Sequence, residues 1–505
     1  MLSFSRESFY PAHMSDPQNK LSFVEKAGYS VGDAAANFVF QLLIIFQAGF
    51  YTDVMGISAA ALGTLLLLVR FADAVFDPVM GAIADRTTHR WGKFRPWVLW
   101  SAVPFALVFW AAFTVPGGTG AGARLAYAAV TYTLLMMVYS LNNVPYSALM
   151  GVMTGDSSER TGLASYRFVA GIGAAFVVQG FTLPLVGKLG GGDDAKGWSL
   201  TVAIYAVVAI GFFLITFFTT KERIQPPKDQ EMNLKHDLAD LRQNGPWMAM
   251  FGMTLFVFIT LSLRGGSYYY YFTYYVDAPS LRAFVEKLGL ATSADSHGAG
   301  FAILDLFGLV MKPGDDPSKI GFSVFNMTGN LVQIMGVLVA KPLADRFGKK
   351  AVFTTGLAGA TLVQIAFFGL EPTSIGAMFL MQILSASAYG PTIPLLWAMI
   401  GDTADYSEWK TGRRATGFVF AGVVFALKAG LGFGGAISGW LLAAYGYTVE
   451  TAHDPAVLNG IRWMASVYSA VPFGIGVLCM LFYSITKELN LRMTKELTAR
   501  RLAQP

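Results

Sequence analysis

Long apolar stretches separated by short polar loops dominate the pattern of this chain. A helix needs about 20 apolar residues to cross the hydrocarbon of a membrane. Twelve stretches reach that length, over approximately residues 28–51, 58–85, 94–115, 124–150, 163–187, 198–219, 247–275, 320–343, 350–370, 375–400, 415–445 and 460–486. Backbone groups in lipid must be satisfied inside helices or a closed barrel, and the stretches lack the strict alternation that is typical of strands. The pattern therefore predicts an all-α membrane protein with twelve transmembrane helices.

The composition agrees with a protein that lies mainly in lipid. Hydrophobic residues make up 54% of the 505 residues and charged residues only 14%, whereas a soluble protein carries about 25% charged residues. A soluble enzyme and a nucleic-acid-binding protein are both excluded by this balance. Residues 1–27 lack the apolar core of a signal peptide, so we expect a cytoplasmic N-terminal tail there and a second tail over 487–505.

The distribution of basic residues predicts how the chain is oriented. The loops that follow the second, fourth, sixth, eighth and tenth stretches hold about twice as many Lys and Arg residues as the loops on the opposite side. Cytoplasmic loops carry the excess of basic residues. We therefore expect both termini in the cytoplasm and the chain in a bacterial inner (plasma) membrane.

Two loops repeat the same pattern at equivalent places in the chain. GAIADRTTHRWGKFR follows the second stretch at 81–95, and AKPLADRFGKK follows the eighth at 340–350. The repeat predicts two pseudo-symmetric six-helix bundles, over 28–219 and 247–486, joined by a cytoplasmic linker at 220–246. This duplicated plan is typical of secondary transporters, whose binding site lies between the halves near the middle of the membrane.

The repeated loops also suggest a role for their charged residues. Their D-R-x-G-[RK] pattern resembles the loop signature of the major facilitator superfamily, which implies the major facilitator fold. We expect Asp85 and Arg86 in the first half, and Asp345 and Arg346 in the second half, to act in gating rather than in substrate contact.

Two further segments are polar or too short to span a membrane. Residues 231–242 place three leucines on one helical face, which predicts an amphipathic helix along the inner surface. The extracytoplasmic insertion at 277–319 contains the apolar run FAILDLFGLVM at 301–311. We expect that run to form an interfacial or capping helix on the outer face.

Ionisable residues inside the apolar stretches point to a functional path. Each costs about 2.5–3.5 kcal/mol at the centre of a membrane helix on insertion scales, so such residues usually face water or a partner. Away from the ends of the stretches, the ionisable residues are Asp33, Arg70, Asp73, Asp77, Arg167, Arg264 and Lys428. We assign a structural role to Arg264 and consider the others as candidate functional residues.

Asp73 and Asp77 are one helical turn apart, so their carboxylates stack on one face. Two adjacent carboxylates repel, and they either share a proton or hold a cation. Lys428 lies well inside its stretch and would then be a tethered cation that pairs with them when the site is empty. The alternatives are an ion pair of Asp73 with Arg70, and a Lys428 side chain that reaches the membrane surface.

Other polar residues have two readings each. Arg167 is a candidate for hydrogen bonds to a polyhydroxylated ligand, or for an ion pair with a loop carboxylate such as Glu159. Asn142 and Asn143 are amides that bind sugar hydroxyls, or that join helices to each other. For the run Tyr268–Tyr271 an aromatic belt at the membrane surface is favoured over stacking on a sugar.

Several chemistries are absent from the sequence. None of the five histidines lies in an apolar stretch, which removes a histidine proton relay, and no HExxH or Walker A sequence is present. We therefore do not expect an enzyme or a bound cofactor. We also expect a source of energy other than ATP.

Four motifs resemble one family, the glycoside-pentoside-hexuronide:cation symporters of the melibiose-permease group. They are LSF near the start, FYTDVMG at 50–56, RFADAVFDPVMGAIADRTTHRWGKFRPW at 70–97 and GDTADYSEWKTGRRATG at 401–417. The resemblance implies a cation site at Asp73 and Asp77 with Lys428 beside it. It also implies a sugar site that includes Asp33 and Arg167, with Asn37 as a rival for the position of Asp33.

Three positions depart from the family pattern. Asn143 replaces an aspartate that binds sugar, and Ser147 replaces a tryptophan, so melibiose itself is a doubtful substrate. Phe76 replaces an asparagine associated with sodium, although Ser140 still offers a hydroxyl. Because the loss of an amide oxygen weakens sodium binding more than proton binding, these departures favour H⁺ over Na⁺, with Na⁺ at Asp73 and Asp77 as the alternative.

The sequence therefore predicts a monomeric symporter that imports a glycoside, pentoside or hexuronide together with a cation by alternating access. The partners are a small sugar, H⁺ or Na⁺, and the lipid bilayer. The substrate site would contain Asp33, Asn37, Asn143 and Arg167, and the cation site Asp73, Asp77, Ser140 and Lys428. The alternative is a cation-coupled carrier of a non-sugar amphiphile such as a lysolipid.

Overall fold

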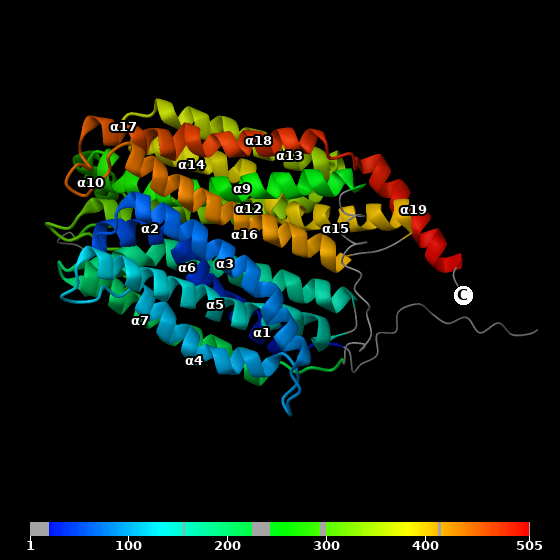
Figure 1. The fold of residues 1–505 in the computed structure, drawn as a ribbon. Helices are drawn as coiled ribbons and strands as arrows, with labels where there is room; N and C mark the ends of the chain where they lie inside the picture. The colour runs from blue at the N-terminus through cyan, green and yellow to red at the C-terminus, as the bar shows by residue number, and fades with distance from the viewer. Residues whose placement is uncertain (1–19, 155–156, 225–242, 293–298, 413–415, 504–505) are drawn as a thin grey trace, which may run out of the picture.

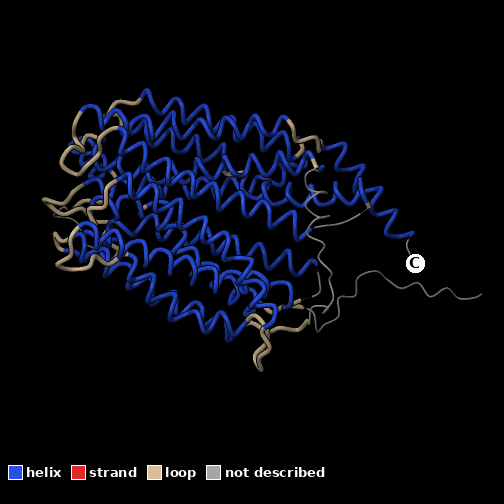
Figure 2. The backbone as a smooth tube through the Cα atoms, viewed as in Figure 1, coloured by secondary structure: helices blue, strands red, loops and turns tan. Residues whose placement is uncertain are grey.

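Among the described residues, twelve helices are long and apolar enough to cross a membrane. The structure is a computed structural model, and it describes residues 20–154, 157–224, 243–292, 299–412 and 416–503. The all-α fold class is thus confirmed, and Figure 2 shows helices joined by loops throughout. An isolated bridge between Ala291 and Met311 is the single strand-like pairing in the described part of the chain.

The spans fall into two sets of six. The first set comprises α1 (Phe23–Ile45), α3 (Ala59–Arg86), α4 (Arg95–Ala112), α5 (Ala121–Met153), α6 (Ser157–Gly190) and α7 (Asp194–Thr219). The second comprises α9 (Gly245–Tyr270), α12 (Pro317–Phe347), α13 (Lys349–Ala366), α14 (Ile375–Tyr389) with α15 (Thr392–Thr411), α16 (Thr416–Ala444), and α17 (Pro455–Trp463) with α18 (Ser469–Leu481). We call these sets the N-half and the C-half; they form the lower and upper groups of helices in Figure 1.

The remaining helices are short or lie at the chain end. They are α2 (Gln47–Gly49), α10 (Ala278–Lys287), α11 (Ala299–Leu306) and α19 (Lys487–Ala503). We call the end of the bundle that carries α19 the inner end and the opposite one the outer end (Figure 1). The expected amphipathic helix at 231–242 lies outside the described residues. The insertion contains α10 and α11, where the sequence suggested one capping helix over 301–311.

Carboxylates fix the inner ends of two helices of the N-half. Ser22 and Glu25 form a capping box that starts α1 five residues before the apolar stretch begins, with Ser22 accepting from the Glu25 backbone N–H at 3.2 Å. Glu222, just beyond α7, accepts from the backbone N–H groups of Lys93, Phe94 and Arg95 at 2.7–2.9 Å. The first N–H groups of a helix have no intrahelical partner, so these carboxylates stabilise α1 and α4.

The two halves pack closely at the outer end through glycines. A Cβ atom at Gly439 of α16 would lie 2.6 Å from the Gly63 backbone nitrogen of α3, and one at Gly265 of α9 would lie 3.0 Å from the Ile44 carbonyl oxygen of α1. Real Cβ atoms do not approach that closely, so larger residues would push the halves apart. The outer end is therefore closed by direct helix contact between the halves.

The aromatic belt expected at Tyr268–Tyr271 is wrong. All four side chains are buried, and the rings of Tyr270 and Tyr271 are fully buried. Tyr270 contacts the hydroxyl of Thr52 at 2.8 Å, while Tyr274 and Tyr447 donate to the Asp53 carboxylate at 3.0 and 2.6 Å. Tyr270, Tyr274 and Tyr447 thus have polar partners from the other half and lie between the halves, while Tyr268 bonds to Gln364 of its own half.

We predict that Gly439→Ala weakens the closure of the outer end. The added methyl group overlaps the backbone of α3, and overpacking typically costs about 1–3 kcal/mol. The midpoint of thermal unfolding in detergent should therefore fall. Gly211→Ala in α7 is the matched control, because a Cβ there meets no atom within 4 Å. Equal unfolding midpoints for the two variants would contradict the close contact.

Candidate functional site

Two carboxylates of α3 meet one lysine of α16 near the middle of the bundle. Lys428 Nζ lies 3.0 Å from Asp73 Oδ2 and is in direct contact with Asp77 Oδ2. The Asp73 side chain is fully buried, whereas Asp77 is 23% exposed and Lys428 is 14% exposed. The two halves thus meet here through an ion triad, since α3 belongs to the N-half and α16 to the C-half.

The alternatives considered for these residues do not match the structure. Among the described residues, no ion pair joins Arg70 to Asp73. Lys428 points toward the carboxylates and remains largely buried, so its side chain does not reach the membrane surface. Asp73, Asp77 and Lys428 therefore lie together, as the sequence predicted.

The Ser140 hydroxyl joins both carboxylates from α5. Its oxygen lies 2.8 Å from Asp73 Oδ1 and 2.6 Å from Asp77 Oδ1. A hydroxyl has one proton to donate, so Ser140 can donate to one carboxylate only. The second short contact is satisfied when the other carboxyl group is protonated and donates to Ser140. The geometry can accordingly hold one proton between the two aspartates.

A second cluster joins α1 and α6 in the N-half. Arg167 Nε donates to Asp33 Oδ1 at 2.6 Å, and Asn37 Nδ2 donates to Asp33 Oδ2 at 3.0 Å. Gly171 leaves room for this contact, because a Cβ there would lie 3.2 Å from Asp33 Oδ2. Asp33 and Asn37, which the sequence offered as rivals, thus belong to one cluster.

The alternative partner of Arg167 is wrong. Glu159 forms an ion pair with Lys26 at 2.8 Å, and the guanidinium of Arg167 instead pairs with Asp33 and lies over the ring of Tyr146, 5.3 Å from its centroid. An ion pair with an aromatic surface beside it is an arrangement that can bind sugar hydroxyls and pack against a sugar face.

The two asparagines of α5 differ in their surroundings. Asn142 is buried and donates to Ser101 of α4 at 2.8 Å, which makes it a contact between helices. Among the described residues, the hydrogen bonds of Asn143 are long contacts within its own helix, at 3.4 Å to Tyr139 and Ser147. Its amide is partly exposed and therefore more available to a ligand.

α5 connects the two clusters physically. It contributes Ser140 to the aspartate pair and Tyr146 to the surroundings of Arg167. Six residues separate these positions, which corresponds to about 9 Å along a helix. A shift of α5 would thus act on both clusters.

An amide chain further toward the outer end was not predicted. Gln179 Nε2 of α6 donates to Gln41 Oε1 of α1 at 2.8 Å, and Asn330 Nδ2 of α12 donates to Gln179 Oε1 at 3.1 Å. The sequence contained one signal for it: Asp33, Asn37 and Gln41 recur every fourth residue and share a helix face. The contact with Asn330 requires knowledge of which helices are neighbours.

The charged residues of the repeated loops lie at the inner end. Asp85 pairs with Lys93 at 3.0 Å and is 67% exposed. The backbone carbonyl oxygens of Asp345 and Arg346 accept from Lys487 of α19 at 2.5 and 3.3 Å. A gating role for these residues and for Arg86 stays a prediction.

Comparisons with known proteins identify the family of the chain. The model of the family described as MFS/sugar transport protein matches residues 28–294 and 314–487. The inner membrane symporter YicJ of Escherichia coli (strain K12) is 35% identical over 94% of this chain and 95% of the relative. The isoprimeverose transporter of Lactiplantibacillus pentosus is 31% identical over 93% of this chain and 90% of its own length.

Solved structures share the fold. The D-xylose-proton symporter has a TM-score of 0.54 and 16% identity, and covers 92% of this chain and 96% of its own. A bacterial homolog of the human lysosomal transporter Spinster has a TM-score of 0.60 and 13% identity, and covers 95% of this chain and 99% of its own. These likenesses support the major facilitator fold.

The family consists of transporters, which are not enzymes, and its model covers most of the chain. The chain is therefore a multi-pass inner membrane protein that belongs to the MFS/sugar transport protein family.

Proposed function

We propose that this protein imports a glycoside, pentoside or hexuronide together with a proton by alternating access, as a monomer with both termini in the cytoplasm. The observation that carries the proposal is the contact of Ser140 with both Asp73 and Asp77. Two carboxylates around one hydroxyl form a proton site, and α5 extends from it to the Asp33–Arg167 cluster. The relative that is named as an isoprimeverose transporter supports a sugar as the substrate.

The ion triad explains how a cation changes the contact between the halves. Two carboxylates and one ammonium group have a net charge of −1, and one bound proton brings this to zero. Protonation of the pair weakens its attraction to Lys428, so α16 is released from α3. In the empty carrier the positive charge of Lys428 balances part of the negative charge of the two carboxylates. The protein can then return to its starting state without two unpaired carboxylates in the transport path.

The ligands available favour a proton over sodium. Sodium needs several oxygen ligands. The candidate ligands here are Asp73, Asp77 and Ser140, because Phe76 has no oxygen to add. Asp73 Oδ2 is buried and makes no hydrogen bond in the described residues, although it lies 3.0 Å from Lys428 Nζ. Because Oδ2 faces the ammonium group, a proton binds between the Oδ1 atoms and Ser140, where it needs no further ligand.

The sugar would bind at Asp33, Asn37 and Arg167, with Asn143 beside them. Coupling is then reciprocal: the sugar raises the affinity for the proton by the same factor by which the proton raises the affinity for the sugar. The closed outer end, with Gly63 against Gly439, corresponds to the state that releases substrate to the cytoplasm.

We predict that Asp77→Asn abolishes sugar accumulation. Purified protein in liposomes should import sugar and make the outer medium alkaline, whereas D77N should do neither because its amide cannot take up the proton. Asp454→Asn on the exposed outer loop is the matched control and should behave like the unchanged protein. Full accumulation by D77N would contradict the proton site. Alkalinisation driven by lysolipids and not by sugars would favour the amphiphile carrier.

We also predict that Phe76→Asn creates a dependence on sodium. Its amide oxygen would add a ligand one residue from Asp77 and three from Asp73. Uptake by the unchanged protein should be the same with and without Na⁺, whereas F76N should be stimulated by Na⁺. Phe76→Leu removes the ring without adding an oxygen and serves as the control. Uptake by the unchanged protein that appears only with Na⁺ would overturn the preference for protons.

A further inference from the structure

We propose that Gln41, Gln179 and Asn330 form a second subsite, which binds the sugar unit or aglycone that lies beyond the unit held at Asp33 and Arg167. This inference rests on the proposed function and names the residues that select for substrate length. Gln41 and Gln179 belong to the N-half and Asn330 to the C-half. The subsite is thus divided between the halves.

The position of the amide chain fits a substrate of two units. Asp33, Asn37 and Gln41 lie on one face of α1, and the eight residues from Asp33 to Gln41 correspond to about 12 Å. That length exceeds one sugar ring and matches two linked rings. Gly180, next to Gln179, allows close packing of α6 on α12, since a Cβ there would lie 2.7 Å from Met327 Cγ.

The amides retain unused hydrogen-bonding capacity. A primary amide offers two N–H donors and one oxygen with two lone pairs. In the described part of the chain, Gln41 Nε2 and Asn330 Oδ1 make no hydrogen bond, and neither is among the buried atoms that lack a partner. Both Gln41 and Gln179 are partly exposed, and the bond from Asn330 to Gln179 crosses between the halves. Partly exposed amides with free donors and acceptors are what sugar hydroxyls require.

The inter-half bond also explains why the subsite would act during transport. The bond from Asn330 to Gln179 links α12 to α6, so it must break when the outer end opens. Opening then frees an amide nitrogen on one half and an amide oxygen on the other. A sugar that enters from outside can satisfy both groups and bring the halves together again.

A kinetic comparison tests the subsite. A screen of xylose, glucose and glucuronate, each as methyl glycoside and as a disaccharide, first identifies a transported pair. Asn330→Ala and Gln179→Ala should each raise the KM for the disaccharide about tenfold, as expected for the loss of a hydrogen bond. The KM for the methyl glycoside should change less than about twofold. Thr328→Val on the same helix is the control, because the Thr328 hydroxyl donates to the Val324 carbonyl oxygen of its own helix.

Each outcome has a distinct meaning. An equal rise in KM for both substrates would overturn the subsite, because the amides would then serve only to hold the halves together. An unchanged KM for both substrates would overturn it as well. The absence of transport for every sugar by the unchanged protein would instead overturn the proposed function.

A second inference concerns the outer face and rests on different contacts. We propose that residues 299–319, which we call the strap, hold the C-half to the N-half in the state that is closed at the outer end. The family model matches residues up to 294 and again from 314. Most of the strap therefore lies outside the shared family pattern.

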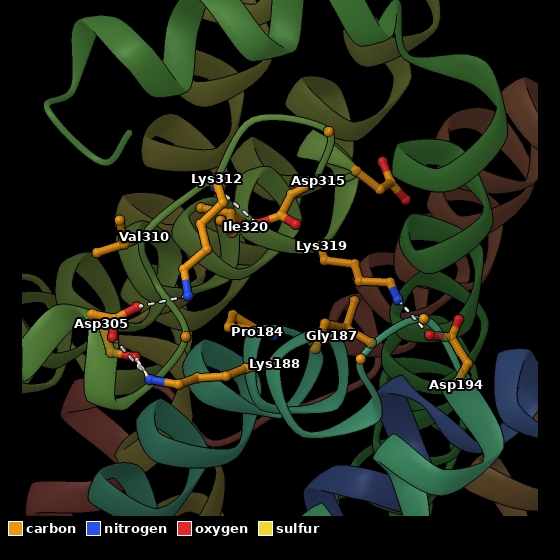
Figure 3. A pocket seen from close by; sticks show the side chains of 16 residues that line it. Pro184, Gly187, Lys188, Asp194, Asp305, Val310, Lys312, Asp315, Lys319 and Ile320 are labelled. Atoms are coloured by element: carbon orange, nitrogen blue, oxygen red, sulfur yellow. Dashed lines mark hydrogen bonds and ion pairs between the residues drawn. The ribbon is translucent and has the colours of Figure 1, made fainter. Parts of the chain in front are cut away.

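Figure 3 shows the strap facing the outer ends of α6 and α7 across a cavity of about 370 Å³. Lys188 of α6 pairs with Asp305 Oδ2 at 3.1 Å and also donates to the Asp305 carbonyl oxygen. Lys319 pairs with Asp194 of α7 at 2.6 Å. Both ion pairs join the halves, and opening of the outer end must break them.

Apolar and backbone contacts complete the strap. The rings of Phe307 and Phe181 stack with their centroids 4.6 Å apart. Gly308 has a φ of +73° and lies so close to α6 that a Cβ would be 2.5 Å from the Pro184 carbonyl oxygen. Only glycine suits that backbone conformation and that distance. The strap is thus fitted to the N-half along several residues.

A distance measurement tests the strap. Spin labels at Ala121→Cys and Glu450→Cys, in a Cys479→Ser background, report the separation of the halves at the outer face. Lys188→Ala combined with Lys319→Ala should at least double the population with the longer distance, because both ion pairs that join the strap to the N-half are then lost. Lys287→Ala on α10 is the control, and Gly308→Val should act like the double variant. Distance distributions that match the unchanged protein in both test variants would overturn the proposal.

Discussion

The contact of Lys428 with Asp73 and Asp77 is the interaction on which the rest of the structure depends. Three ionisable groups at this depth would be costly in lipid if each stood alone, and together they leave a single excess negative charge. Because α3 and α16 belong to different halves, the charge balance of the site and the distance between the halves are set by the same contact. A cation that binds here changes both at once.

Helix α5 links the ion triad to the Asp33–Arg167 cluster, so a change at the triad can reach that cluster. Ser140 brings α5 into contact with both aspartates, and the same helix provides Tyr146 next to Arg167. A rigid helix of this kind moves as a unit, so a rearrangement at the carboxylates alters the position of the aromatic ring one or two turns away. The coupling proposed above would therefore not require direct contact between the cation and the sugar.

Most of the fold could be predicted because it follows from apolar length, but some boundaries could not. α1 begins at Phe23 since Ser22 and Glu25 cap it, ahead of the apolar stretch. The predicted belt at Tyr268–Tyr271 was wrong because the pattern does not reveal that polar partners lie on the other half, as Thr52 does for Tyr270.

The candidate site could be predicted where charge was the signal. Asp73, Asp77 and Lys428 were identifiable because charges in apolar stretches are rare, and they do lie together. Neutral amides are much less conspicuous in a sequence. Gln179 and Asn330 are 151 residues apart in the chain, and their contact follows only from the packing of α6 against α12.

Alongside ring contacts such as that of Phe46 with Phe322, many contacts between the halves at the outer end are polar or involve glycine, and the polar contacts have a physical consequence. A purely apolar interface would hold the halves together too firmly, and its opening would expose apolar surface to water. Amides, phenols and ion pairs that separate can be satisfied by water or by sugar hydroxyls, so the two states remain close in free energy. Glycine contacts add close packing without adding much apolar area. A carrier that must pass repeatedly between two states requires such an interface, because a ligand can shift the balance only by its differential affinity for the two states.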